Sequence, residues 1–190
     1  MKLLYIVTAW PRYAEDIITP WLVRQVSELR VVGHEVDVLA PSYRGQPSFA
    51  GEHRFRYFPA RWEDLTHDRP AMDKVKDVAG WLKLTGYVVC GCIEAAWLNG
   101  RKHYDVVHVH WPLPHIVFGH AARLTWPKTK IVATFYGSEF PMLRKSALLR
   151  FAMKELLWPC RVTAISTYTR DELFKLLRWI WADVIPYGAA

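Results

Sequence analysis

Polar and aromatic residues follow several short apolar segments of the chain, at the positions where parallel α/β sheets bind their ligands. They are Thr8, Trp10, Arg12 and Asp16 after the first segment, His110 and Trp111 after a later one, Tyr136, Gly137, Ser138 and Glu139 after the next, and Ser166, Thr167 and Thr169 after another. Because the carboxyl ends of parallel strands meet at one edge of a sheet, we expect one rim to collect them. Ordinary loop polarity and helix capping are the alternative explanation, which we favour for Thr19 and Thr169.

The stretch from Tyr136 to Glu139 suggests binding of a phosphate or a sugar hydroxyl. Gly137 permits a close approach of the backbone to a ligand, and a helix beginning near Ser138 would present free N–H groups to it. A simple turn glycine is the alternative interpretation.

Two histidines, His108 and His110, point to the same side of one expected strand. Such a pair could bind a metal ion, but no third ligand is evident, so we expect no metal. We predict that His108 is a hydrogen-bonded core residue and that His110, nearer the strand end, faces the cleft as a polar contact.

Short apolar or β-branched segments alternate with helical ones along the chain. Strands are expected at Leu3–Thr8, Val36–Ala40, His53–Phe58, Val106–His110, Ile131–Phe135, Val162–Ile165 and Val184–Ile185. Helices are expected from Pro20 to Gly33, over Asp73–Asn99, Leu113–Leu124 and Leu143–Leu157, and from a Thr169–Glu172 capping box to Leu177. Gly80, Gly86 and Gly91 predict that the second helix is bent or divided in two. The alternation predicts a doubly wound, mainly parallel α/β domain over residues 1–190.

Composition narrows the class of protein further. The chain has 190 residues, 52% of them apolar, with 25 Lys and Arg against 18 Asp and Glu, a surplus that attracts anions. Three cysteines form no zinc or disulfide pattern, no signal peptide is evident, and the longest charge-free run, between Lys83 and Glu94, is too short to span a membrane. We therefore expect a cytoplasmic protein. The motifs of dinucleotide-binding domains, P-loops, serine hydrolases and zinc proteases are absent.

Two segments suggest surfaces for larger partners. Arg54, Arg56 and Arg61, interleaved with aromatic residues, could contact a nucleic acid, although an edge strand with a solvated basic face is the preferred interpretation. Trp81, with lysines nearby, suits a helix in a membrane interface, while core packing explains many of the ten tryptophans equally well.

The order and spacing of several segments resemble the N-terminal domain of family 4 glycosyltransferases over essentially the whole chain. These segments are Trp10-Pro11-Arg12 with Asp16, Gly33-His34-Glu35-Val36 into Val38–Pro41, Phe55–Trp62, Asp105–Trp111, Thr134–Glu139, Thr163–Ser166 and Val184–Gly188. The family often has glycines where this chain has Tyr13-Ala14-Glu15, and a His-Gly-x-Asp motif where it has Tyr136-Gly137-Ser138-Glu139. Tyr136 and Glu139 keep an aromatic hydrogen-bonding group and a carboxylate, so the resemblance implies an adapted site.

The resemblance implies a GT-B enzyme, in which two Rossmann-like domains hold the acceptor and the nucleotide sugar respectively. Only the acceptor side has a counterpart in this sequence, which ends as if cut at a linker, so we expect it to be inactive alone. Tyr136, Glu139 and His110 are the expected catalytic residues. The expected substrate contacts are Arg12, Asp16, Trp111, Gly137, Ser138, Ser166 and Thr167.

The expected partners are a nucleotide-sugar donor bound by a second domain, a glycan or lipid-linked acceptor, and peripherally the inner face of a membrane. No cofactor, metal ion or nucleic acid is expected. A non-catalytic subunit of a split glycosyltransferase, which binds the acceptor or recruits its partner to the membrane, is the alternative function.

Overall fold

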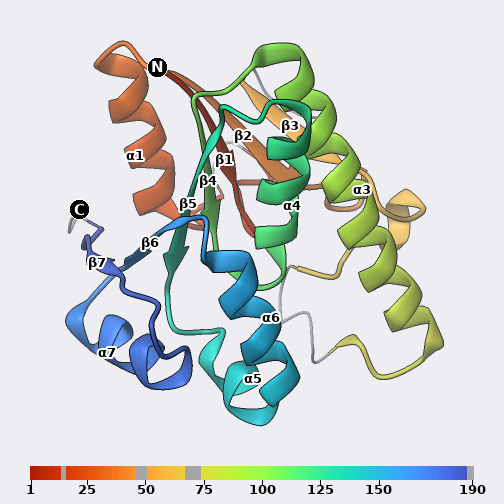
Figure 1. The fold of residues 1–190 in the computed structure, drawn as a ribbon. Coiled ribbons are helices and arrows are strands. Elements are labelled where there is room, and N and C mark those ends of the chain that lie inside the picture. The colour runs from red at the N-terminus through yellow and green to blue at the C-terminus, as the bar shows by residue number, and fades with distance from the viewer. Residues whose placement is uncertain (14–15, 46–50, 67–73, 188–190) are drawn as a thin grey trace.

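The computed structural model describes residues 1–13, 16–45, 51–66 and 74–187. Over these ranges the chain forms a seven-stranded parallel sheet in the order β3-β2-β1-β4-β5-β6-β7 (Figure 1). The strands are β1 (Lys2–Ile6), β2 (Glu35–Pro41), β3 (Glu52–Phe55), β4 (Val106–His110), β5 (Lys130–Phe135), β6 (Arg161–Ala164) and β7 (Asp183–Val184). Asp73, Ala14, Glu15 and Gly188, which entered the sequence-based predictions, lie outside the described residues.

Helices cover both faces of the sheet, with α1 on one side and α3 and α4 on the other (Figure 1). Their bounds are α1 (Pro20–Val31), η1 (Ala60–Trp62), α3 (Val78–Lys102), α4 (Pro112–Thr125), α5 (Phe140–Lys145), α6 (Ala147–Leu157) and α7 (Thr167–Leu176). Alternate residues of β1 serve the two cores: Leu4 and Ile6 join the larger cluster, whereas Leu3 and Tyr5 join the smaller one beside α1. The predicted doubly wound α/β fold is confirmed.

Strand order reverses between β1 and β4, which pair in parallel with Tyr5 opposite His108. At such a reversal the connections leave the two strands toward opposite faces of the sheet, and doubly wound domains bind their ligands at the carboxyl ends of these strands. The loop from β1 to α1 and the start of α4 border this position. The fold therefore places the predicted rim where doubly wound domains bind ligands.

α3 is one continuous helix through Gly80, Gly86 and Gly91, so the prediction that these glycines divide it in two was wrong. Its glycines are sites of close packing. A Cβ atom on Gly91 would lie 2.4 Å from the ring of Phe118 in α4, and one on Gly86 would lie 2.6 Å from the carbonyl oxygen of Tyr57. The tertiary contacts, which sequence periodicity does not report, explain why glycines occur within this helix.

Helix starts also differ from the prediction in three places. Thr19 has a left-handed backbone and its hydroxyl donates to the carbonyl of Ala9 at 3.3 Å, so it does not cap α1. Ser166, and not Thr169, caps α7, since its Oγ accepts from the Thr169 amide at 3.1 Å. The helix expected over residues 143–157 is broken at Ser146, whose side chain caps α6.

The Gly91–Phe118 contact generates a stability prediction. Gly91→Ala should lower the free energy of unfolding by about 1–3 kcal/mol, because the buried Phe118 ring has to move. Gly100→Ala is the matched control, since its Cβ would meet Thr125 at an ordinary 3.5 Å. We expect that variant to gain up to about 1 kcal/mol from helix propensity. Urea denaturation of both variants tests this, and equal effects would contradict the packing argument.

Candidate functional site

The carboxyl ends of β4 and β5 bring three of the predicted site residues into contact. His110 Nδ1 and the Tyr136 hydroxyl are 2.7 Å apart and share a hydrogen bond. The rings of Trp111 and Tyr136 stack with centroids 4.4 Å apart and planes 24° from parallel. Burial raises the pKa of Tyr136 well above its usual range, so its hydroxyl stays protonated.

His110 lies deeper than predicted. Only 1% of the residue is exposed, so it is buried beneath the rim and does not face the cleft. Burial first, and then the neighbouring His108, hold its pKa well below the ordinary value, so the ring is neutral. Its Nε2 atom is buried and has no hydrogen-bond partner among the described residues. His110 therefore reaches the rim through Tyr136.

His108 is hydrogen bonded, as predicted, but it is partly exposed and not a fully buried core residue. Its Nε2 and the Thr134 hydroxyl lie 2.7 Å apart, and Thr134 bonds in turn to the Thr163 hydroxyl at 2.6 Å. Burial lowers the pKa of His108 to about 4. Throughout the described ranges, His, Cys, Asp and Glu side chains form no group of three or more suited to a metal ion.

Two aromatic residues that the sequence analysis missed extend the Trp111–Tyr136 stack. The ring of Trp21, in the first turn of α1, has its centroid 5.1 Å from that of Tyr136. Tyr187, after β7, stacks on Trp21 with the ring centroids 4.8 Å apart. Both follow the carboxyl end of a strand in the predicted topology, and that placement was the available signal. These four residues, Trp21, Trp111, Tyr136 and Tyr187, are called the aromatic cluster below.

Glu139 is a buried carboxyl group at the base of the loop after β5. It is 3% exposed, and its Oε2 accepts hydrogen bonds from the Gly137 amide at 3.0 Å and the Ser138 hydroxyl at 3.4 Å. The other oxygen, Oε1, is buried without a hydrogen-bond partner in the described part of the chain. Burial raises the pKa of Glu139 to about 7, although these hydrogen bonds oppose the rise. Near neutral pH this group can therefore release or take up a proton.

The loop geometry around Glu139 differs partly from the expectation. Gly137 has φ near 100°, a backbone conformation that favours glycine, so it is required as a turn residue. The helix expected near Ser138 begins at Phe140, and Glu139 occupies its N-cap position. Ser138 is exposed on this loop.

The raised pKa of Glu139 predicts a pH dependence of stability. A folded-state pKa near 7, above the ordinary 4.5, means that the folded state binds the Glu139 proton more tightly than the unfolded state. The resulting contribution of protonated Glu139 to the free energy of unfolding is fully present below about pH 4.5 and is lost as pH rises through 7. Relative to Glu139→Gln, the wild type should lose up to about 3 kcal/mol of unfolding free energy between pH 5 and 8. Denaturation at both pH values checks this. Glu155→Gln, at an exposed position of α6, is the matched control and should change stability with pH as the wild type does. A parallel profile for Glu139→Gln would contradict the assignment.

Arg12 and Asp16, both predicted substrate contacts, pair with each other in the loop between β1 and α1. Arg12 Nε lies 2.7 Å from Asp16 Oδ2, and the Asp16 carboxylate also accepts from the Arg12 and Ile18 amides. Burial alone would raise the pKa of Asp16, but the hydrogen bonds from Arg12 and from the backbone outweigh it and lower the pKa. The pair thus shapes the loop in which it lies.

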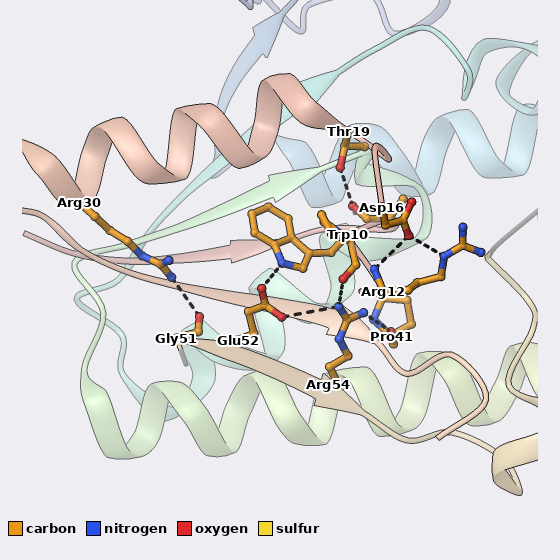
Figure 2. Close-up of polar contacts among 11 residues, drawn as sticks. Trp10, Arg12, Asp16, Thr19, Arg30, Pro41, Gly51, Glu52 and Arg54 are labelled. Carbon is orange, nitrogen blue, oxygen red and sulfur yellow. Dashed lines mark hydrogen bonds and ion pairs between the residues drawn. The ribbon is translucent and has the colours of Figure 1, made fainter. Parts of the chain in front are cut away.

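A second ionic group, missed by the sequence analysis, fixes this loop to β3 (Figure 2). The Trp10 indole donates to Glu52 Oε1 at 2.5 Å, and the Glu52 carboxylate lies 3.6 Å from Arg54. Arg54 also donates to the carbonyl oxygens of Pro11 and Pro41. Only 3% of the Arg54 side chain is exposed, so the solvated basic face predicted for this strand applies to Arg56 but not to Arg54.

This ionic group should be necessary for stability. Glu52→Gln leaves the buried Arg54 guanidinium without its counter-charge and should lower the unfolding free energy by about 3 kcal/mol. The same substitution at Glu28, whose partner Arg24 lies on the exposed face of α1, should cost less than about 1 kcal/mol. Urea denaturation compares the two variants. An equally small loss for Glu52→Gln would show that the carboxylate is not needed to compensate Arg54.

Ser166 and Thr167, two further predicted substrate contacts, differ in what they do in the structure. Ser166 caps α7 and shares a further 2.9 Å hydrogen bond with the Thr169 hydroxyl, whereas Thr167 is exposed at the start of the helix. His115, which the sequence analysis missed, fixes the backbone at Trp111. Its Nδ1–H donates to the Trp111 carbonyl at 2.8 Å, and its Nε2 accepts from the Tyr87 hydroxyl at 2.6 Å.

The parallel sheet, its strand-order reversal between β1 and β4 and the rim of polar and aromatic residues define a Rossmann-like domain. The sequence profile of glycosyltransferase family 4 matches residues 21–189, most of the chain. The chain therefore belongs to glycosyltransferase family 4.

A solved structure confirms the fold. Sucrose-phosphate synthase from Thermosynechococcus elongatus, a GT-B protein, superimposes with a TM-score of 0.61 at 16% sequence identity, over 99% of this chain and 48% of that one. The chain thus spans about half the length of the solved protein that it matches. No curated protein sequence matches the chain.

Proposed function

We propose that this chain is the acceptor-binding domain of a retaining glycosyltransferase, which moves a hexosyl or related sugar from a nucleotide sugar to a glycan or lipid-linked acceptor. Membership of glycosyltransferase family 4 supports the reaction class. The two-fold length of the sucrose-phosphate synthase chain supports a two-domain enzyme, in which another domain binds the nucleotide sugar. On this proposal the chain transfers no sugar without that domain.

The contact between His110 and Tyr136, beside the stacked Trp111 ring, carries the proposal. Aromatic rings supply an apolar surface on which the carbon-bound face of a sugar can pack, and nearby polar groups fix its orientation. If neutral His110 carries its proton on Nδ1, it donates to the Tyr136 oxygen. The Tyr136 O–H is then available to donate to an acceptor hydroxyl.

Glu139 is the proposed acid–base group of this site. In the transfer, the acceptor oxygen bonds to the anomeric carbon, the bond from that carbon to the nucleotide phosphate breaks, and the acceptor hydroxyl loses its proton. A carboxyl group with a pKa of about 7 is suited to accept and release such a proton near neutral pH. Because the carboxyl group is buried, we propose that the proton reaches it through the exposed Ser138 hydroxyl, which donates to Glu139 Oε2 at 3.4 Å: Ser138 takes the proton from the acceptor hydroxyl and passes its own to Glu139.

The nucleotide sugar is itself the activated co-substrate, and no cofactor or metal is proposed for this domain. The second domain would hold the charged phosphates. Nucleotide sugars are made in the cytoplasm, so a cytoplasmic site is proposed. The exposed residues Ser138 and Thr167 and the loop containing Arg12 and Asp16 are proposed to line the acceptor side.

The transfer assay follows from these roles. Tyr136→Phe in the natural polypeptide that carries this domain should lower kcat/KM about 10- to 100-fold, because one hydrogen bond made near the reacting hydroxyl is lost. Tyr168→Phe, at an exposed position of α7, is the matched control and should stay within about twofold of wild type. Transfer of labelled sugar from a panel of nucleotide sugars to lipid and glycan fractions measures the rates. Wild-type rates in Tyr136→Phe would remove Tyr136 from the site.

The alternative is a subunit without transferase activity of its own, which binds the acceptor and a separate donor-binding chain. The mass of the native polypeptide in its source cells, compared with the 22.2 kDa of this chain, distinguishes the two. A mass near twice that value supports the two-domain enzyme. A matching mass with a co-purifying second chain supports the split form.

A further inference from the structure

α3 is apolar on both of its faces, but only one of them is buried. Tyr87, Ala95 and Leu98 point into the core, toward α4 and the sheet. On the opposite side a stripe of apolar side chains is between 49% and 77% exposed. This α3 stripe consists of Val78, Trp81, Leu82, Val89, Ile93 and Trp97. A contiguous apolar surface of this kind marks an interaction site.

By length and composition α3 is also sufficient to cross a membrane, with a mean hydropathy of 1.2. The sequence analysis, which relied on the shortness of the charge-free run, had not predicted a helix of this kind. A spanning helix would have to leave the domain, yet the inner face of α3 packs on Phe118 and holds Asn99, which donates to the Ala122 carbonyl at 2.7 Å. The inner face therefore belongs to the folded domain. α3 is positioned to lie on a membrane but not to cross it.

The two tryptophans lie near the two ends of the stripe. Trp81 and Trp97 are sixteen residues apart, which is about 24 Å along the helix. The apolar residues Leu82, Val89 and Ile93 lie between them. Tryptophan favours the boundary between water and hydrocarbon because its ring is apolar and its N–H is polar. In Figure 1, α3 runs along the outer side of the molecule, beyond α4.

Positive charge borders the stripe. Lys76 is exposed just before α3, the Arg101 guanidinium lies 4.8 Å from the Trp97 ring near its end, and Glu94 is the only acid within the helix. Nearby acids are engaged within the protein: Asp64 pairs with Lys83 at 3.0 Å, and Asp77 caps the helix by accepting from the Gly80 amide at 2.7 Å. The ion pair neutralises Lys83, so Lys76 and Arg101 are the positive side chains that flank the two ends of the stripe.

Trp62 extends the same surface from η1. It is 44% exposed, and the Arg61 guanidinium lies 4.5 Å from the centre of its ring. The ring of Phe58 packs beside it, with the two ring centroids 6.0 Å apart. Lys83 of α3 lies 5.9 Å from the Phe58 ring, so η1 and α3 are neighbours. Each of these two elements thus presents an exposed tryptophan with an arginine over its ring.

We propose that the α3 stripe docks this domain on a bilayer that contains anionic lipid. The apolar side chains enter the interfacial region, and Arg61, Lys76 and Arg101 contact the lipid phosphates, in agreement with the net charge of +7. A second copy of the chain fits less well, because two copies carry the same positive net charge of +7 and repel each other. The proposal concerns a surface separate from the aromatic cluster and does not depend on transferase activity.

Flotation of the purified chain with vesicles tests the proposal without donor or acceptor. The vesicles are phosphatidylcholine with about 30% phosphatidylglycerol, or phosphatidylcholine alone, at low and at high salt. Wild type should partition at least about tenfold more strongly onto the anionic vesicles, and salt should weaken binding. Failure of the wild type to bind anionic vesicles at low salt would overturn the proposal.

A pair of double variants locates the surface. Trp81→Ser with Trp97→Ser should reduce partitioning at least about tenfold, because two interfacial anchors are lost. Trp158→Ser with Trp179→Ser, at positions 74% and 76% exposed, is the matched control and should bind like wild type. Circular dichroism melts confirm that both fold. Equal losses of vesicle binding in the two variants would overturn the assignment of the α3 stripe to lipid. The same holds if Trp81→Ser with Trp97→Ser leaves vesicle binding unchanged but abolishes self-association of the chain.

Discussion

The parallel pairing of β1 with β4 is the contact on which the candidate site depends. Both strands are buried between helices, with Leu4 and Val107 facing one core and Leu3 and Tyr5 facing the other. Because strand order reverses here, the chain leaves β1 toward α1 and leaves β4 toward α4, on opposite faces. The polar rim is thus a consequence of hydrophobic burial on two sides of one sheet.

Buried polar groups set the character of this rim. His110, His115, Glu139 and Arg54 are all taken out of water, and each is held by at least one hydrogen bond or ion pair. Burial keeps the histidines neutral and raises the pKa of Glu139 to about 7, because a charge is poorly solvated inside the domain. In Glu139 the same burial that would cost stability produces a group whose protonation suits proton transfer near neutral pH.

α3 links the core to the outer surface. Its glycines allow α4 and the segment around Tyr57 to approach closely, and this fixes which side of the helix faces outward. The outward side is apolar, so the packing that completes the core also presents the α3 stripe to the surroundings. Acceptor binding and membrane docking, both proposed here, would then use different elements of one rigid domain, with the lipid-facing helix beside the sheet that carries the rim.

The sequence alone determined the alternation of strands and helices, because apolar periodicity and the prolines and glycines that end each element are local properties. It also placed Tyr136, Trp111 and Glu139 at one rim, since parallel strands end together. Tertiary structure alone decided that α3 is continuous, that Arg54 is buried against Glu52, and that Trp21 and Tyr187 join the aromatic cluster. Each of these depends on contacts between segments far apart in the chain, where close packing and desolvation outweigh local propensity.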